Sequence, residues 1–472
     1  MTVTLTADEI ALLKGSDPNK RYMVVYNGTD ETVYPALIGY DTNNKILTDV
    51  DADNLPSGFT LESKKYKILT FPKTVISGRI IARTGCKMVK GLYGDGLDGL
   101  LCDTGDCHQS YDPKSGNPAD VTYKVSQKGL LCNVKGGAAP ATVLEFSFTD
   151  KDFYDVSQVD GNNMSAQMEP ILNQDPNVPS GTDKNYWCQA AGCTAKLDCP
   201  KELRVYDNNK KWIACQSIGA AISGIGTAAD GGPQRYQGGT PPGPYSDFTG
   251  MLKETDPDSY NLLMKMYNVK YYWDANSPNK GGDPNRAWTK TGSWLPDADS
   301  TKCTDPSTCI TAKTLLSCAA DAGNSCGDPG AGKLPTFKVP DQGCSPNVTT
   351  YNTPDYAPHL CWSENWPQAS DGSNYHKIFK DMCPNAYSWQ FDDFSSTFTC
   401  NSSGPAPVHY FVQFYPYSGT PETINLGPSP PSPSPTPSPP DDKKDSWWTP
   451  LHISIIVGIV LLLLILVLKL AS

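Results

Sequence analysis

The chain has 472 residues, which is enough for one large core or for several domains. Its net charge of −11 excludes nucleic acid as a partner, because basic side chains are too few to neutralise phosphates. The 40 glycines, the 41 prolines and a charged fraction of 19% are typical of a loop-rich β protein.

The cysteines predict a disulfide framework. There are sixteen of them, an even number, and they occur in clusters. Zinc is the alternative, but the chain has five histidines and no pair of Cys-x-x-Cys knuckles at the spacing of a zinc ribbon. We therefore expect disulfides, no metal ion and no cofactor.

Residues 1–21 are expected to form an N-terminal extension. They lack the basic start and apolar core of a signal peptide. A short helix capped by Thr6 is predicted over residues 6–13, and Gly15 ends it. Strands are predicted at residues 22–26 and 32–36, where apolar and aromatic residues are frequent.

Residues 144–161 place acids on or beside predicted strands. Apolar residues at 144, 146 and 148 alternate with polar ones, Glu145 among them, which predicts a half-buried strand. A second strand is predicted at 153–156, followed by a turn at Asp160. Asp155 and Asp160 are an odd number of positions apart, so they share a site only if the chain bends near Val159. Otherwise the three acids are solvated surface residues.

The C-terminal part predicts a stalk and an anchor. Residues 427–446 begin with a proline/serine run that favours polyproline II and would extend about 40 Å over residues 427–440. Residues 447–470 start with two tryptophans and continue as an almost unbroken apolar run. About 20 such residues span a bilayer, so we expect a single transmembrane helix and lipid as a partner.

Four segments resemble thaumatin-like proteins. They are residues 144–161, residues 77–86 (SGRIIARTGC) with 102–107 (CDTGDC), the cysteine-rich residues 188–215, and residues 383–400 (CPNAYSWQFDDFSSTFTC). The chain is therefore identified as a member of the thaumatin-like protein family. The resemblance implies a mainly β fold, a thaumatin-type β-sandwich with a disulfide-rich lobe enlarged by insertion. It also implies that the strands at 22–26 and 32–36 form a hairpin.

The resemblance places the thaumatin-like domain at residues 22–426. A smaller insertion lies between Cys107 and Cys132, and a large one covers residues 218–373 in the cysteine-rich lobe. The large insertion has a helix-like patch near residues 262–267. Its tryptophans are expected either to stack on sugar rings or to fill the core of the lobe; these are Trp273, Trp288 and Trp294.

The resemblance also implies most of the disulfide pairs. These are Cys86–Cys102, Cys107–Cys132, Cys188–Cys400, Cys193–Cys383 and Cys199–Cys215. Six further cysteines lie in the large insertion, and their pairing stays open. They are Cys303, Cys309, Cys318, Cys326, Cys344 and Cys361.

By resemblance, an acidic cleft is expected between the sandwich and the lobe. Its residues would be Arg79, Glu145, Asp155, Asp160 and Asp392, with Asp393 as the alternative for the last. Converging acids raise one another's pKa, while an arginine favours their charged form. Such carboxyl groups can bind sugar hydroxyls or supply the two groups of glycoside hydrolysis.

We expect a membrane-anchored surface protein whose cleft binds a polysaccharide of the β-1,3-glucan type or another cell-wall glycan. The first alternative is a weak endo-β-1,3-glucanase, in which Glu145, Asp155 and Asp160 would be catalytic. The second is a structural or inhibitory surface protein without glycan activity. Other surface or capsid proteins are further expected partners.

Two features set the expected location. A C-terminal span without a signal peptide predicts a domain on the cytosolic side, where thiols normally stay reduced. One resolution is a virion membrane protein of a large DNA virus that oxidises its own proteins in the cytoplasm. The other is a cell-surface protein from which a signal peptide has been removed.

Overall fold

The computed structural model describes residues 2–15, 17–43, 58–89, 99–106, 139–207, 209–229, 248–274, 293–304, 309–317, 366–389, 392 and 395–427. The chain divides into one compact unit, Met1–Ile424, and a second, Asn425–Ser472, of which three residues are described. No helix in the described ranges is long and apolar enough to cross a membrane. The anchor predicted at 447–470 and the stalk predicted at 427–446, apart from Gly427, lie outside those ranges.

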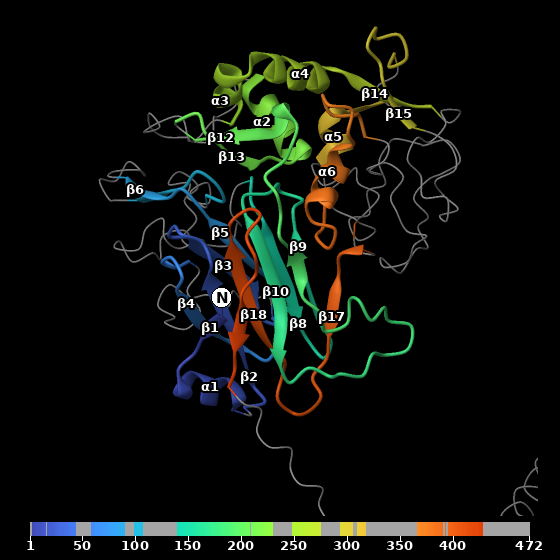
Figure 1. The fold of residues 1–472 in the computed structure, drawn as a ribbon. Coiled ribbons are helices and arrows are strands. Elements are labelled where there is room, and N and C mark those ends of the chain that lie inside the picture. The colour runs from blue at the N-terminus through green and yellow to red at the C-terminus, as the bar shows by residue number, and fades with distance from the viewer. Residues whose placement is uncertain are drawn as a thin grey trace, which may run out of the picture. The chain divides into compact units, whose positions relative to one another are not determined.

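Two five-stranded sheets form the larger part of the first unit (Figure 1). The outer sheet has the order β17-β9-β8-β5-β3, with strands Phe398–Cys400, Asp152–Ser157, Val143–Phe148, Val75–Arg83 and Tyr34–Tyr40. The inner sheet has the order β11-β10-β18-β2-β4, with strands Ala191–Cys193, Ser165–Leu172, His409–Tyr415, Lys20–Asn27 and Tyr66–Pro72. Strands β18 and β2 are parallel, and the other neighbours in both sheets are antiparallel.

The predicted N-terminal elements are present, but their pairing differs from the expected hairpin. Helix α1 covers Ala7–Lys14, and the Glu9 amide donates to Thr6 Oγ1 while the Thr6 amide donates to Glu9 Oε2. Strands β2 and β3 do not pair with each other, because β2 lies between β18 and β4 while β3 pairs with β5 in the other sheet. The predicted hairpin is therefore wrong, although both strands exist.

An aromatic core joins the two sheets. Phe146 and Phe148 of β8 point inward and are 3% and 0% exposed, which confirms the predicted alternation. The Phe148 ring stacks on Tyr410 of β18 with 5.0 Å between centroids, and Phe146 meets Phe71 of β4 edge to face at 5.7 Å. The polar residues of β8 must then face away from the core.

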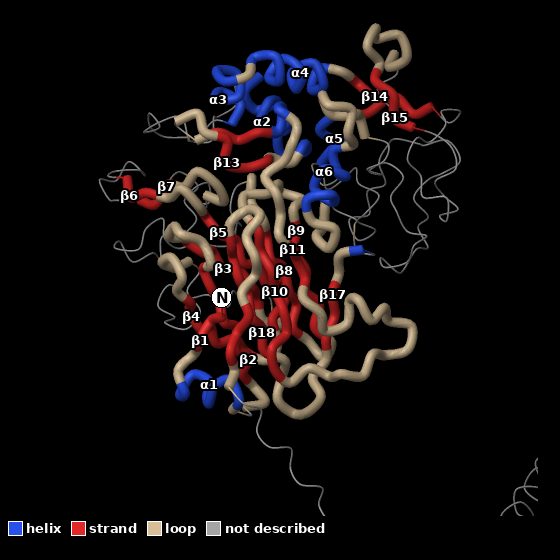
Figure 2. The backbone as a smooth tube through the Cα atoms, viewed as in Figure 1, coloured by secondary structure: helices blue, strands red, loops and turns tan. Residues whose placement is uncertain are grey.

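A helical lobe with its own core covers one end of the sandwich, and α1 lies at the other end (Figure 2). The lobe contains η4 (Lys201–Leu203), β12 (Arg204–Tyr206), β13 (Trp212–Cys215), α2 (Ile218–Ala229), α3 (Phe248–Thr255), α4 (Pro257–Asn268), α5 (Ala312–Ser317), α6 (Tyr375–Met382) and a sheet of β15 (Ser293–Pro296), β14 (Lys270–Asp274) and β16 (Cys309–Thr311). The helix-like patch of the large insertion is thus α4. Short strands complete the fold: β1 (Thr2–Thr4), β6 (Lys87–Val89), β7 (Gly99–Leu101) and β19 (Thr423–Asn425).

A disulfide connects the lobe to the sandwich. Cys193 of β11 is bonded to Cys383, which follows α6. Four more bonds are present, of which the first three were implied by the family resemblance: Cys86–Cys102, Cys188–Cys400, Cys199–Cys215 and Cys303–Cys309. The remaining cysteines lie outside the described residues; these are Cys107, Cys132, Cys318, Cys326, Cys344 and Cys361.

A buried ion pair connects the two sheets at the end away from the lobe. Arg21 Nη1 of β2 lies 2.6 Å from Asp152 Oδ2 of β9, and Tyr410 donates a hydrogen bond of 2.8 Å to the same oxygen. Arg21 also packs over the Phe148 ring at 4.7 Å. Burial raises the pKa of Asp152 to about 6, so the pair is ionised at pH 7.5. Loss of either side chain would leave the other charge buried without a partner, so the stability of the fold is sensitive to both residues.

We predict that Asp152→Ala lowers the free energy of unfolding by about 3–5 kcal/mol at pH 7.5, because it leaves the Arg21 charge buried without its partner. Denaturant unfolding of the full chain measures the change. Asp150→Ala is the control, since Asp150 is exposed in the adjoining turn and should change stability by less than about 0.5 kcal/mol. Equal effects of the two substitutions would contradict the prediction.

Candidate functional site

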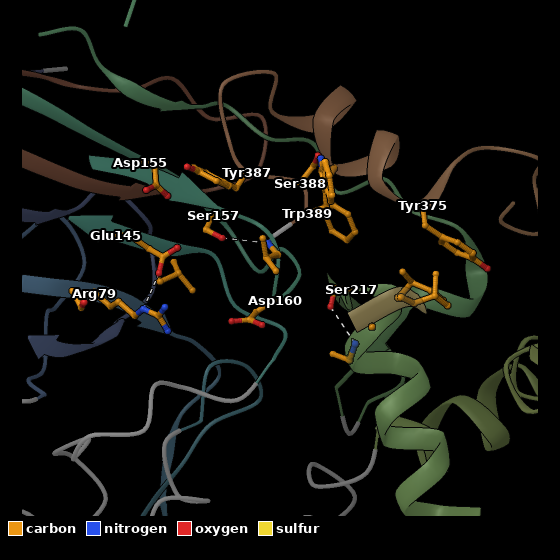
Figure 3. Close-up of a pocket in the computed structure, with 18 of the residues that line it drawn as sticks. Arg79, Glu145, Asp155, Ser157, Asp160, Ser217, Tyr375, Tyr387, Ser388 and Trp389 are labelled. Carbon is orange, nitrogen blue, oxygen red and sulfur yellow. Dashed lines mark hydrogen bonds and ion pairs between the residues drawn. The ribbon is translucent and has the colours of Figure 1, made fainter. Parts of the chain in front are cut away.

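A cleft of about 690 Å³ lies where the lobe meets the outward face of the outer sheet. One wall comes from β5, β8 and β9 of the sandwich. The other comes from the first turn of α2, from α5 and α6, and from residues 387–389 (Figure 3). The two walls have different chemistry, since acids are concentrated on the sheet and aromatic side chains on the lobe.

Three charged residues form one row across the sheet. Glu145 of β8 is the register partner of Arg79 on β5 and of Asp155 on β9. Directly opposed residues have Cβ atoms about 4.5–5.5 Å apart and share a face. Because Leu144 and Phe146 point into the core, this row must point outward, and all three side chains line the cleft.

A bulge in β5 keeps Arg79 on the outer face. The register shifts between Val75 and Gly78, and Ser77 between them has a φ of 51°. Gly78 is required here, because a Cβ at this position would overlap the Phe146 ring. Bulges are common beside functional sites, where they redirect a side chain. As a result, both Ser77 and Arg79 are exposed.

Asp160 joins the row through a bend in the chain. Strand β9 ends at Ser157, whose Oγ accepts a hydrogen bond of 3.4 Å from the Val159 amide, and the Gly161 amide donates to Gln158 O at 2.9 Å. Gly161 has a φ of 99°, and its Cα lies against the Cys215 carbonyl of the lobe, so a larger residue would not fit. The bend that the sequence required near Val159 is present, and Asp160 lines the same cleft as Asp155.

Asp392 does not line the cleft, so the prediction that it belongs to the cleft is wrong. Its carboxylate is 2.8 Å from Lys380 Nζ and accepts hydrogen bonds from the hydroxyls of Ser388 and Ser395. The Asp392 carboxylate is therefore engaged by these three partners, and the contacts fix the loop after α6. Asp393, the alternative residue, lies outside the described residues.

Arg79 and the acids set the electrostatics of the cleft. Arg79 Nε lies 2.7 Å from Glu145 Oε1, while Arg79 keeps half of its side chain exposed. Burial raises the pKa of Glu145, the Arg79 charge opposes this shift, and the Asp160 carboxylate adds to it. Burial likewise raises the pKa of Asp160 against the effect of Arg79. The cleft therefore holds protons more tightly than exposed carboxylates would.

The wall contributed by the lobe was not predicted from the sequence. Tyr375, Phe379 and Trp389 line it and are at most 5% exposed. Buried Glu202 accepts a hydrogen bond of 2.9 Å from the Tyr375 hydroxyl and one of 2.7 Å from the Ser370 amide, which fixes this wall. Figure 3 shows Ser217 and Tyr375 across the cleft from Arg79 and Glu145. The aromatic residues of segment 383–400 were the only signal that could have indicated this wall.

Stacking of sugar rings on the tryptophans of the large insertion remains a prediction. Trp273 and Trp294 are register partners in β14 and β15, and Trp288 lies outside the described residues.

None of the described residues forms a cluster of histidine, cysteine and acidic side chains that could hold a metal ion.

Most of the chain matches one protein family. The model of the Thaumatin family matches residues 123–227 and 236–416. The chain is 31% identical over 209 residues to pathogenesis-related protein 5 of Arabidopsis thaliana, which covers 43% of this chain and 69% of that protein. It is 28% identical over 240 residues to a glucan endo-1,3-beta-glucosidase of Prunus avium, and this match covers 50% of this chain and 78% of that protein.

A solved structure of a laminaripentaose-producing beta-1,3-glucanase in complex with laminaritetraose aligns over 85% of this chain and 99% of that one. Its TM-score is 0.38 and the sequence identity is 11%. A likeness of this size carries no inference about activity.

We predict opposite effects of two substitutions on Glu145. Arg79→Met should raise the pKa of Glu145, because it removes the neighbouring positive charge, and Asp160→Asn should lower it, because it removes a negative one. A ¹³C titration of glutamate carboxyl groups measures both, with Glu145→Gln identifying the signal. Arg204→Met is the control, since Arg204 stacks on Trp212 in the lobe. Shifts of the same sign in both cleft variants would contradict the account.

Proposed function

Because the chain belongs to the thaumatin family, we propose that its acidic cleft binds a neutral polysaccharide of the β-1,3-glucan type. The proposal rests on the row formed by Arg79, Glu145 and Asp155, which are neighbours by strand register. Asp160 lines the same cleft as this row. The volume of about 690 Å³ is within the usual range for sites that enclose a ligand of several rings.

The acids favour a ligand that donates hydrogen bonds and carries no negative charge. Carboxyl oxygens accept hydrogen bonds, so Asp155 and Asp160 suit the hydroxyl donors of a neutral sugar. Each sugar hydroxyl is also an acceptor, and the lobe offers donors on the opposite wall. They are the hydroxyl of Ser217 and the amides of Ile218 and Gly219 in the first turn of α2, which have no partner within their own helix.

Hydrolysis of the same polymer is the second candidate, and one observation favours it. Glu145 and Asp155 are direct cross-strand neighbours. Their Cβ atoms lie about 4.5–5.5 Å apart on one face of the sheet, so both carboxyl groups can reach the same glycosidic bond, as the two carboxyl groups of retaining glycosidases do at a separation of about 5–5.5 Å. Burial raises the pKa of Glu145, which fits a proton donor, and Asp155 would then be the nucleophile. The Prunus avium relative is a glucan endo-1,3-beta-glucosidase by name.

We also propose that the protein is held at a membrane surface by residues 447–470, on a cell or on a virion. The apolar run at 451–468 and the proline/serine run before it support this proposal, since together they suit an anchor and a spacer. The disulfides of the first unit suit an oxidising location. Lipid would then be a partner, and other surface or capsid proteins would be neighbours.

We predict that Asp155→Asn weakens the binding of laminarihexaose about tenfold or more, because hydrogen bonds to a charged acceptor are the strong ones. Isothermal titration calorimetry on the full chain measures the affinity. Asp150→Asn, in the turn at the other end of β9, is the matched control and should bind as the wild type does.

The same proteins distinguish binding from hydrolysis. Release of reducing ends from laminarin by the wild type, and its loss in Asp155→Asn, would establish the glucanase. Binding without release would leave a binding module. Unchanged affinity in Asp155→Asn would contradict the proposed site itself.

A further inference from the structure

Two N-glycosylation sequons lie in the interior of the folded domain. An Asn-x-Ser/Thr sequon that carries an N-glycan belongs in a surface loop, because the glycan is bulky and needs water around it. The sequons at residues 27–29 (NGT) and 163–165 (NMS) are both in the described part of the chain. Asn27 ends β2 and is 0% exposed, and Asn163 lies just before β10 and is 4% exposed.

The side chain of Asn27 uses all of its hydrogen-bonding groups. Its Nδ2 donates hydrogen bonds of 2.7 Å to Glu31 O and 2.9 Å to Leu61 O. Its Oδ1 accepts hydrogen bonds from the amide and the hydroxyl of Thr29, at 2.9 Å and 2.7 Å. In N-glycosylation, C1 of the sugar bonds to Nδ2, a lipid diphosphate leaves and Nδ2 loses one proton. Because Nδ2 has only two N–H groups, a glycan on Asn27 would break one of these bonds and place a sugar inside the fold.

Asn163 is held in the same way. Its Nδ2 donates hydrogen bonds of 2.8 Å to Ala82 O and of 2.8 Å to Thr104 Oγ1. Its Oδ1 accepts a hydrogen bond of 2.9 Å from the Thr142 amide. Three segments that are distant in the sequence thus meet on one side chain, and both of its N–H groups are in use. A glycan on Asn163 would separate these segments.

The hydroxyl residues of the two sequons are buried as well. Thr29 is 8% exposed and Ser165 is 1% exposed. The glycan-transferring enzyme requires the asparagine and the hydroxyl together in an accessible chain, so neither sequon can be modified after folding. Before folding both are accessible. Asn27 is the clearer case, because its register partner Phe414 lies near the other end of the domain and is synthesised much later.

The sequon at residues 401–403 (NSS) differs from these two. Asn401 is half-buried, and its Nδ2 donates no hydrogen bond to another residue of the described part of the chain. A glycan at this position costs the fold no donor. The remaining sequon, at residues 347–349 (NVT), lies outside the described residues.

We propose that an N-glycan on Asn27 or Asn163 excludes this fold, and that the domain therefore folds where disulfides form but N-glycans are not added. The Cys193–Cys383 bond joins segments 190 positions apart, so folding needs an oxidising system. The eukaryotic secretory pathway supplies oxidation and N-glycosylation together. An oxidising system in the cytoplasm supplies the first without the second, as the proposed virion location requires. This inference does not depend on what the cleft binds.

The test sends the full chain through the secretory pathway of insect cells behind an added signal peptide, with and without tunicamycin, which blocks N-glycosylation. Peptide mapping measures the Cys193–Cys383 bond and the glycan occupancy of each sequon, in folded and in misfolded chains. Misfolded chains should carry glycans on Asn27 or Asn163, and folded chains should carry none there. Tunicamycin should raise the yield of folded chains severalfold. Asn401 is the internal control, since its glycan should be tolerated in folded chains.

A second measurement tests the same side chains without any glycan. Asn27→Asp and Asn163→Asp keep the shape of the side chain but remove both N–H donors. In full chains made in an oxidising bacterial cytoplasm, each should lower the denaturant midpoint of unfolding. Asn209→Asp is the matched control, because Asn209 is exposed in the turn between β12 and β13, and its midpoint should stay at the wild-type value.

Three results would overturn the proposal. Folded chains with a glycan on Asn27 or Asn163 would show that the fold admits the sugar. If both sequons stay unmodified in folded and misfolded chains alike, or if tunicamycin does not raise the folded yield, the secretory pathway is no obstacle to this domain. Equal midpoints for Asn163→Asp, Asn27→Asp and Asn209→Asp would show that the fold does not need these donors.

Discussion

The register of β8 between β5 and β9 determines where the chemistry of this protein lies. Phe146 and Phe148 are fixed in the core by stacking on rings of the other sheet. Glu145 must then point outward and meet Arg79 on one side and Asp155 on the other. A slip of one residue would bury Glu145 and expose both phenylalanines, so the core that stabilises the sandwich also positions the acidic row.

The acidic cleft reduces the stability of the free protein at neutral pH. The pKa values of Glu145 and Asp160 are raised above their ordinary values of 4.5 and 3.8. The folded chain therefore binds protons more tightly than the unfolded chain at these groups. Their contribution to the free energy of unfolding falls as the pH rises above about 4, until both groups are ionised in the folded state. Arg79 limits this cost, and a ligand that donates hydrogen bonds to the acids would limit it further.

Much of the sandwich could be predicted from local sequence. The alternation in β8 and the capping residues of α1 act between near neighbours, so the sequence displays them directly. The condition on Asp160 was also visible, because an odd spacing requires a bend. The bend itself depends on Gly161 fitting against the Cys215 carbonyl, which is a contact between distant segments.

The errors have the same origin. Asp392 belongs to a segment that resembles the family closely, yet its carboxylate is used by Lys380 and two serines inside the loop. The partners of β2 lie far along the chain, so the sequence could not show that β2 and β3 belong to different sheets. The wall built from the lobe depends on Glu202 binding residues more than 160 positions away. Such packing has no local signature.

If both walls of the cleft bind one glucan chain, laminarihexaose must protect backbone amides on both walls, and hydrogen exchange measures this protection. The amides of Ile218 and Gly219, in the first turn of α2, have no partner within the helix and should exchange quickly in the free protein. Laminarihexaose is expected to slow exchange at these two amides and, in the same experiment, at residues 387–389 and 158–160. Binding of laminarihexaose with unchanged exchange at residues 217–220 would contradict it.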